Sequence, residues 1–142
     1  MKLNTYLHFD GQCREAFETY ARVLGGKIAA VMTYGEAPMG GKECPPAERN
    51  KIIHVRLELG DQVLMGSDSP PGHASPLSGF SISINVASDA EAERVYKALS
   101  EGGKVFMPLE KTFWAKKFAM FADRFGTPWM VNYEEKAMEK AA

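Results

Sequence analysis

The chain is organised around two neighbouring stretches, Phe113-Trp114-Ala115-Lys116-Lys117-Phe118 and Asp123-Arg124-Phe125-Gly126-Thr127-Pro128-Trp129-Met130-Val131-Asn132. Both tryptophans of the chain lie here, and four phenylalanines fall within the same twenty residues. Gly126 and Pro128 predict a tight turn, and the alternation that starts at Trp129 predicts a short apolar strand. This aromatic corner is either part of the hydrophobic core or the wall of a pocket.

The bulk composition is that of one ordinary globular domain. The 142 residues are 45% hydrophobic and 25% charged, and their net charge of −1 gives no electrostatic footprint for nucleic acid. No apolar run approaches the ~20 residues that cross a bilayer. The start, Met1-Lys2-Leu3-Asn4, does not resemble a signal peptide. We therefore expect a cytoplasmic protein in which Cys13 and Cys44 are free thiols.

The first half of the chain predicts one strand, one helix and three further strands. Apolar residues recur at helical spacing from Ala16 to Leu24, and Gly25-Gly26 ends this helix. The loop over residues 35–50 is either a lid or binding segment or a disordered insertion. The strands of this half are expected at residues 4–9, 27–34, 52–59 and 62–67.

The second half repeats this order. Ser88-Asp89-Ala90-Glu91 fits a capping box at the start of a helix, and Gly102-Gly103-Lys104-Val105 repeats Gly25-Gly26-Lys27-Ile28 with a spacing of 77 residues. The strands of this half are expected at residues 80–86, 104–107, 118–122 and 129–133, and residues 134–142 as a frayed helical tail. We interpret residues 1–142 as a single domain of two halves, 1–68 and 80–133, separated by a Pro- and Gly-rich segment.

Alternation along the strands predicts a polar face on each sheet. One helix per half covers only one sheet face, and the apolar faces should pack on the helices because that burial drives folding. The opposite faces either line a cavity between two curved sheets or contact solvent. They carry Asn4, Tyr6, His8, His54, Arg56, Glu58, Ser81, Ser83, Asn85 and Asn132.

Several motifs spread over nearly the whole chain carry a resemblance to a known family. They are Tyr6-Leu7-x-Phe9-x-Gly11, Ala16 with Tyr20, Leu24-Gly25, Tyr34-Gly35-Glu36-x-Pro38, Ile53-His54-x-x-Leu57, Met65-x-Ser67-Asp68, Thr112-Phe113-Trp114-Ala115 and Asp123-x-Phe125-Gly126-x-Pro128-Trp129-Met130-Val131-Asn132. With these motifs the chain resembles the vicinal oxygen chelate superfamily (glyoxalase I, bleomycin-resistance proteins and extradiol dioxygenases), and within it the PhnB-like group. The resemblance implies an α+β fold of two βαβββ repeats, whose cupped, mixed or antiparallel sheets surround a cavity with the helices on the convex side. It also implies a homodimer.

The resemblance further implies where a metal would bind. Enzymatic members hold a divalent metal with His, Gln or Glu from the first and fourth strands of each half. These positions correspond here to Asn4 (or Thr5), Met65, Ser81 and Met130. Thioethers and hydroxyls are poor ligands for hard or borderline cations, so we expect no metal and no other cofactor at this site.

A relocated metal site is the alternative. Its ligands would come from His8, His54, Glu58 and His73. Against this site, residues four apart in a strand, such as His54 and Glu58, are separated by ~13 Å.

Two classes of function follow from these observations. The first is a binding module that holds a small, partly apolar molecule without the usual metal site, as bleomycin-resistance proteins sequester their ligand. Met65 and Met130 would form an apolar floor, and Arg56 would pair either with an anionic group of the ligand or with Glu58. The expected pocket residues are Tyr6, His8, His54, Arg56, Glu58, Met65, Ser81, Trp114, Met130 and Asn132.

The second class is an enzyme, a metal-dependent lyase, isomerase or dioxygenase of the superfamily. A dimeric scaffold without a small-molecule ligand is a third possibility. The methyltransferase label sometimes attached to such sequences has no support in these residues, because no Gly-rich cofactor-binding segment opens a helix after a strand.

Overall fold

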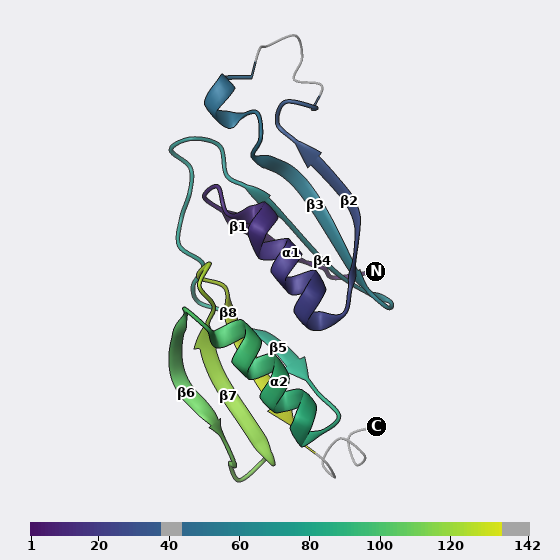
Figure 1. Cartoon of the computed structure of the whole chain (residues 1–142), viewed down its shortest axis with the longest axis vertical. Coiled ribbons are helices and arrows are strands. Elements are labelled where there is room, and N and C mark those ends of the chain that lie inside the picture. The colour runs from purple at the N-terminus through teal and green to yellow at the C-terminus, as the bar shows by residue number, and fades with distance from the viewer. Residues whose placement is uncertain (38–43, 135–142) are drawn as a thin grey trace. The chain divides into compact units, whose positions relative to one another are not determined.

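The computed structural model describes residues 1–37 and 44–134 (Figure 1). Contacts divide the chain into two compact units, Met1–Pro76 (unit 1) and Leu77–Ala142 (unit 2). The junction lies in the Pro- and Gly-rich segment after the fourth strand. No helix in the described part of the chain has the length and apolar character that a bilayer crossing requires.

Unit 1 has the predicted order of one strand, one helix and three strands. Its sheet has the order β1-β4-β3-β2, in which β1 runs parallel to β4 and the other neighbours are antiparallel. The elements are β1 (Thr5–Phe9), α1 (Cys13–Leu24), β2 (Lys27–Thr33), the 3-10 helix η1 (Pro46–Glu48), β3 (Ile52–Leu59) and β4 (Gln62–Asp68). The predicted loop over 35–50 is therefore interrupted by a short 3-10 helix, and Pro38 of the family motif lies outside the described residues.

Unit 2 repeats this arrangement. Its sheet has the order β5-β8-β7-β6, with β5 parallel to β8. The elements are β5 (Ile82–Asn85), α2 (Asp89–Ser100), β6 (Lys104–Glu110), β7 (Lys117–Ala122) and β8 (Pro128–Tyr133). The capping box is confirmed, since Ser88 Oγ accepts a hydrogen bond from Glu91 N at 3.1 Å. Strand β5 is shorter than predicted because Phe80, Ser81 and Val86 lie outside the ladder.

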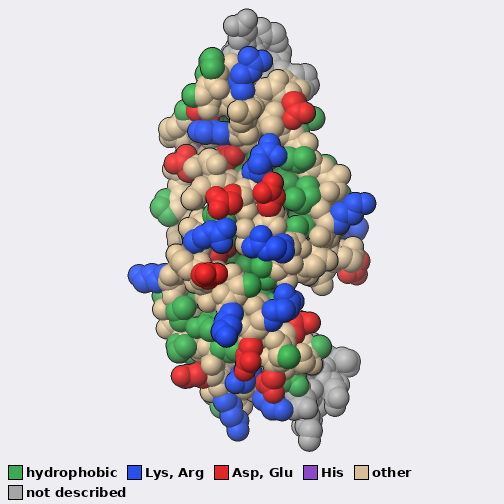
Figure 2. Space-filling model, viewed as in Figure 1, with side chains coloured by type: hydrophobic (Ala, Val, Ile, Leu, Met, Phe, Trp, Pro, Cys, Tyr) green, Lys and Arg blue, Asp and Glu red, His purple; other side chains and the backbone are tan. Residues whose placement is uncertain are grey.

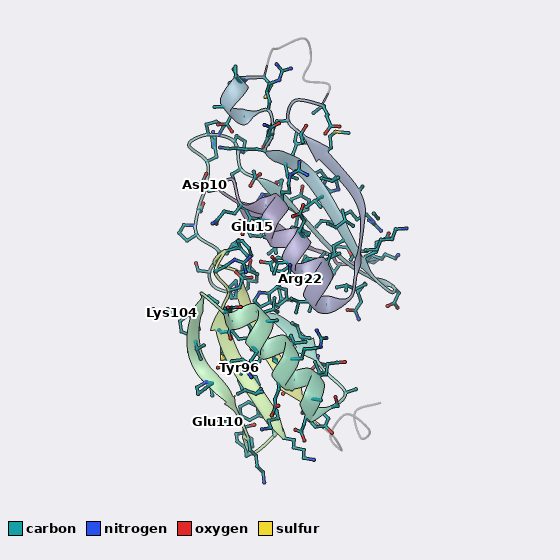
Figure 3. The ribbon with its side chains drawn as sticks, viewed as in Figure 1. Asp10, Glu15, Arg22, Tyr96, Lys104 and Glu110 are labelled. Atoms are coloured by element: carbon teal, nitrogen blue, oxygen red, sulfur yellow. The ribbon has the colours of Figure 1, made fainter. Side chains whose placement is uncertain are left out.

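Each helix packs on one face of its own sheet, as the alternation of apolar residues predicts. In unit 1, Phe17 of α1 makes edge-on ring contacts with Phe9 of β1 and with Tyr20. In unit 2, the ring of Tyr96 on α2, which is labelled in Figure 3, lies edge-on to Phe121 of β7 with 5.7 Å between the ring centroids. Along each strand, the residues that alternate with these helix-facing residues point to the face of the sheet that the helix does not cover. The α+β class and the two mixed sheets are therefore confirmed.

The repeated Gly-Gly pairs have the same structural role in both units. Gly25 and Gly102 follow the helices with φ of 76° and 75°, a left-handed conformation that favours glycine. The second glycine of each pair passes very close to a neighbouring strand. A Cβ on Gly26 would lie 2.8 Å from Glu58 O, and one on Gly103 would lie 2.1 Å from Ala122 O. The sequence repeat therefore reflects a real backbone constraint.

A buried carboxylate fixes one end of unit 1. Asp68 is 1% exposed, and its two oxygens accept hydrogen bonds from Cys13 N (3.0 Å) and Ile52 N (2.8 Å). Its carbonyl oxygen accepts a further bond from Tyr34 Oη at 2.7 Å. The end of β4 is thus tied to the starts of α1 and β3. Burial, and after it the charge of Asp68, raises the pKa of the Cys13 thiol well above its ordinary range.

The surface charges are mixed. Lysine and arginine side chains alternate with acidic side chains on the face shown in Figure 2. This distribution fits the net charge of −1 and shows no basic patch on that face.

Candidate functional site

The sheet of unit 2 places thioethers side by side on the face that α2 does not cover. In the register of the strands, Met130 of β8 lies between Ser83 of β5 and Met120 of β7, and Met120 in turn pairs with Met107 of β6. Phe121, the neighbour of Met120, contacts α2, so Met120 points to the opposite face. Three methionines therefore form one row across three strands.

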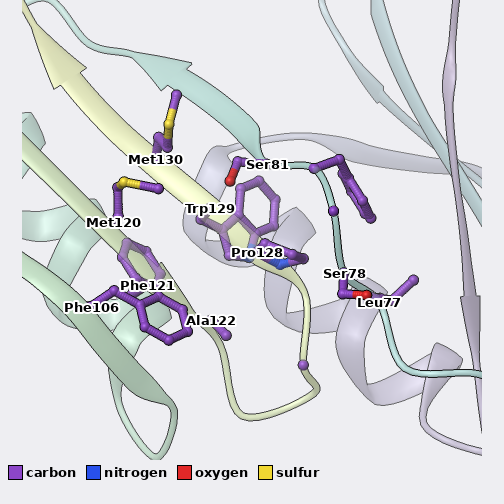
Figure 4. A pocket seen from close by; sticks show the side chains of 13 residues that line it. Leu77, Ser78, Ser81, Phe106, Met120, Phe121, Ala122, Pro128, Trp129 and Met130 are labelled. Atoms are coloured by element: carbon purple, nitrogen blue, oxygen red, sulfur yellow. The ribbon is translucent and has the colours of Figure 1, made fainter.

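A pocket of about 620 Å³ lies in unit 2 (Figure 4). This volume is in the range of small-molecule sites, about 300–1,000 Å³. Ser81 and Met130, two of the residues expected from the sequence, are among those that line it. The lining is completed by Leu77, Ser78, Gly79, Phe80, Phe106, Met120, Phe121, Ala122, Gly126, Pro128 and Trp129. The pocket is therefore lined mainly by apolar side chains.

A second buried carboxylate positions the wall of this pocket. Asp123 Oδ1 accepts hydrogen bonds from Phe125 N (2.9 Å) and Thr127 N (3.0 Å), and Oδ2 accepts one from Trp129 Nε1 at 2.8 Å. Asp123 is 5% exposed and Trp129 1% exposed. The predicted turn at Gly126 exists, with φ of 93°. Sequence reasoning quoted Asp123 only as part of a motif, although an Asp before a Gly-containing turn is typical of side-chain-capped turns.

The two alternatives for the aromatic corner both apply to Trp129, whereas Trp114 lies outside the pocket. Trp129 belongs to the core and also lines the pocket. Trp114 is 39% exposed and lies edge-on between Phe113 (4.8 Å between centroids) and Phe118 (5.0 Å). It does not line this pocket, and Phe113 is 97% exposed.

Asn132 carries an unpaired acceptor. Its side chain is buried on β8, where Asn85 of β5 and Phe118 of β7 are its register partners. Its Nδ2 donates to Asn85 Oδ1 (3.1 Å) and to Glu134 Oε2 (2.6 Å). No group among the described residues donates to its Oδ1. A buried polar atom without a partner costs about 1–3 kcal/mol.

The uncovered face of unit 1 brings three expected site residues together. Tyr6 Oη lies 3.0 Å from His54 Nδ1, and the Tyr6 ring lies 5.1 Å from the ring of His8 and 5.7 Å from that of His54. His8 Nδ1 is 3.4 Å from Ser67 Oγ. Met65 is the register partner of Tyr6. These side chains form a polar and aromatic cluster over three strands.

Arg56 pairs with Glu58 on the same face. Its Nε lies 3.1 Å from Glu58 Oε2, and the two side chains are 38% and 42% exposed. The simpler of the two predicted roles for Arg56 is therefore present in the structure. A pair this exposed contributes only about 0–1 kcal/mol.

The positions implied for a metal do not suit one. The resemblance places the ligands at Asn4 (or Thr5), Met65, Ser81 and Met130, and the register pairs Met65 with Tyr6 and Met130 with Ser83. The donors at the implied positions are an amide or a hydroxyl, a second hydroxyl and two thioethers, which do not match a hard or borderline cation.

The relocated metal site is not assembled in the structure. Within residues 1–37 and 44–134, no three His, Cys, Asp or Glu side chains are placed to hold one ion. The alternative set of His8, His54, Glu58 and His73 is therefore not brought together. Glu58 pairs with Arg56 instead.

Comparisons with known proteins agree with this architecture. Residues 1–132 match the model of the 3-demethylubiquinone-9 3-methyltransferase family. Protein YjdN of Escherichia coli is 32% identical over 139 residues, covering 93% of this chain and 95% of YjdN. The crystal structure of protein PA1353 from Pseudomonas aeruginosa is 48% identical, with a TM-score of 0.86, and covers 94% of this chain and 98% of PA1353.

Two further solved structures share the fold of this chain. A putative 3-demethylubiquinone-9 3-methyltransferase, PhnB protein, from Bacillus cereus is 26% identical, with a TM-score of 0.78 over 94% of this chain and 99% of its own. The fosfomycin resistance protein FosX from Listeria monocytogenes is 9% identical, with a TM-score of 0.62 over 93% and 91%, and shares the fold alone. The chain therefore belongs to the PhnB-like 3-demethylubiquinone-9 3-methyltransferase family.

Proposed function

We propose that the protein binds a small, partly apolar molecule in the pocket of unit 2. The observation that carries this proposal is the pocket itself, with Met120 and Met130 in one row and rings beside them. Methionine is flexible and polarisable, so a floor of thioethers adapts to ligands of irregular shape. The few polar groups near this floor, among them Ser81, would fix the orientation of the bound molecule.

The exposed apolar surface around the pocket supports the proposal. Phe80 and Phe106, which line it, are 41% and 56% exposed, and the neighbouring Met107 is 41% exposed. Covering such surface contributes about 25 cal/mol per Å² of apolar area removed from water. A bound apolar molecule would supply this cover.

The alternative of a metal-dependent lyase, isomerase or dioxygenase has no comparable support. The resemblance places its metal ligands at Asn4 (or Thr5), Met65, Ser81 and Met130, whose amide, hydroxyl and thioether groups suit the expected cations poorly. Methyl transfer with a nucleotide-derived cofactor would use a Gly-rich turn between a strand and a helix. In this chain α1 follows Asp10-Gly11-Gln12 and α2 follows Val86-Ala87-Ser88.

A titration with a simple apolar probe tests the proposal. We expect 1-methylindole, added to the ¹⁵N-labelled full chain, to shift amide signals of β7 and β8 saturably. Met130→Glu should abolish these shifts because it places a charge on the pocket floor. Met32→Glu is the matched control, since Met32 is 42% exposed on β2. Unsaturable shifts, or equal binding by the two variants, would refute the pocket.

We also propose that the protein is a homodimer, as the family resemblance implies, and that it is cytoplasmic. The native mass of protein purified without chelators reports the subunit number and any retained ligand together. A dimer that carries an organic adduct would support both proposals. A monomer at all concentrations would refute the dimer, and one divalent ion per subunit would revive the enzymatic alternative.

A further inference from the structure

We propose that the ligand of this pocket carries an N–H or O–H group that donates a hydrogen bond to Asn132 Oδ1. This inference deepens the proposed function and rests on it. It assigns a polar subsite to a residue that does not itself line the pocket, and it restricts the ligand to ring-bearing or similarly apolar molecules with a hydrogen-bond donor at one end.

The identity of the unpaired atom follows from its neighbour. The two ends of an asparagine amide have the same shape, so their assignment depends on the hydrogen bonds they make. Glu134 Oε2 lies 2.6 Å from one end of the Asn132 amide. An ionised carboxylate only accepts hydrogen bonds, so this end must be the NH₂ group. The other end, without a partner among the described residues, is therefore the oxygen.

The oxygen belongs to the same sheet face as the pocket floor. Asn132 follows Met130 by two positions on β8, so their side chains share a face and their Cα atoms lie about 7 Å apart. In the register, the row of Asn85 and Asn132 is next to the row of Ser83 and Met130. A molecule of ordinary ligand size on the thioethers can therefore extend to Asn132.

The polar groups around Asn132 favour a hydrogen-bond donor on the ligand. Asn85 Oδ1 and the Glu134 carboxylate already lie at the amide of Asn132, so three acceptor groups meet at this point. A ligand carbonyl or carboxylate would be repelled there, whereas an N–H or O–H group would satisfy the free oxygen.

Some of the side chains near this region are accessible. Asn85 is exposed, and Trp114, which packs edge-on against Phe118, is 39% exposed. Phe118 is the register partner of Asn132 on β7. A ligand that reaches the oxygen requires neighbouring side chains to rotate away from it, and the adjacent rings favour an aromatic ligand body.

Indole and 1-methylindole form a matched probe pair, because they differ only in the N–H group and the methyl that replaces it. We expect the wild-type chain to bind indole about 3- to 10-fold more tightly than 1-methylindole, the range of a single net hydrogen bond. Asn132→Leu should remove this preference. Asn50→Leu, the same change on an exposed turn of unit 1, should keep it. Affinities would come from amide shifts of the ¹⁵N-labelled full chain.

The outcomes separate this inference from the proposed function. If neither probe binds, the pocket itself fails. If the wild-type chain binds both probes equally, or Asn132→Leu keeps the preference, the pocket stands and the subsite is overturned. Should Asn132→Leu not fold, the wild-type Asn132 side-chain amide signals decide. They should shift with indole and not with 1-methylindole, and equal shifts would overturn the subsite.

Discussion

The Asp123 carboxylate should be the most sensitive single position in unit 2. It joins the turn at Phe125 and Thr127 to the indole of Trp129, so one side chain fixes both the turn and a wall of the pocket. The substitution that tests this is Asp123→Asn. It preserves the size of the side chain and replaces one acceptor oxygen with a donor.

The expected cost follows from the three hydrogen bonds. Whichever end the new NH₂ group occupies, it faces a buried N–H, either Trp129 Nε1 or the backbone N–H groups of Phe125 and Thr127. At least one buried donor then loses its partner, at about 1–3 kcal/mol, and the remaining bonds lose the strength that the charge provides. We expect a total loss of about 2–4 kcal/mol in the free energy of unfolding, a large part of the roughly 5–15 kcal/mol typical of whole proteins.

Urea unfolding followed by tryptophan fluorescence measures this loss directly. Both tryptophans lie in unit 2, so the signal reports on the unit that the substitution affects. Asp61→Asn is the matched control, because Asp61 is exposed in the turn between β3 and β4. If the two variants unfold within about 0.5 kcal/mol of each other, the usual range for surface substitutions, the carboxylate does not hold the corner.

Three further predictions concern thiols, the Gly-Gly repeat and a helix cap. Cys44 should react quickly with a thiol reagent and Cys13 only after unfolding, since Cys13 is buried and its pKa is raised. Above about pH 8.5 the Cys13 thiol ionises in the unfolded chain and not in the folded one, so the free energy of unfolding should fall by up to about 1.4 kcal/mol per pH unit. Cys13→Ala should remove this pH dependence. Gly103→Ala should lower the free energy of unfolding by about 3 kcal/mol, because the new Cβ would overlap the backbone of Ala122 and Asp123. Gly60→Ala should lower it by only about 1–2 kcal/mol, because Gly60 has a left-handed φ but open space around it. Ser88→Ala should cost about 1 kcal/mol in the same urea assay by removing the cap of α2, and no change would refute the cap.

Much of the fold could be predicted because it depends on local patterns. Alternation identified the strand Ile52–Leu59 to the residue, and the helix spacing and capping box identified α1 and α2. The Gly-Gly repeat revealed the duplicated units. The ends of several strands differed by one to three residues, because a strand ends where its ladder partner ends, and the sequence alone does not show which strand is that partner or in which register it pairs.

The candidate site was less predictable for the same reason. Alternation assigns a residue to a face and leaves its cross-strand neighbour open, so the pairing of Met65 with Tyr6 and of Met130 with Ser83 emerged only in the structure. The role of Asp68 depends on backbone N–H groups of distant segments brought together by folding, which no residue pattern marks, whereas Asp123 precedes a Gly-containing turn, a pattern typical of side-chain-capped turns. The unpaired oxygen of Asn132 is likewise a property of three side chains at once.

Both units carry a methionine at a place where the family resemblance implies a metal ligand. Met65 on β4 and Met130 on β8 hold equivalent places, each beside the parallel first strand of its unit. Enzymatic members of the superfamily use such places for metal ligands, whose attraction is strong, directional and specific for charge. A thioether offers only dispersion and burial, which are weak per atom and act through area. Under the proposed function, affinity would therefore depend on how much apolar ligand surface the pocket covers, and selectivity on the few polar atoms at its margin. In a series of ligands with increasing apolar area, affinity should rise steadily with area. Removal of the single hydrogen-bond donor from such a ligand should instead lower its affinity by one discrete step.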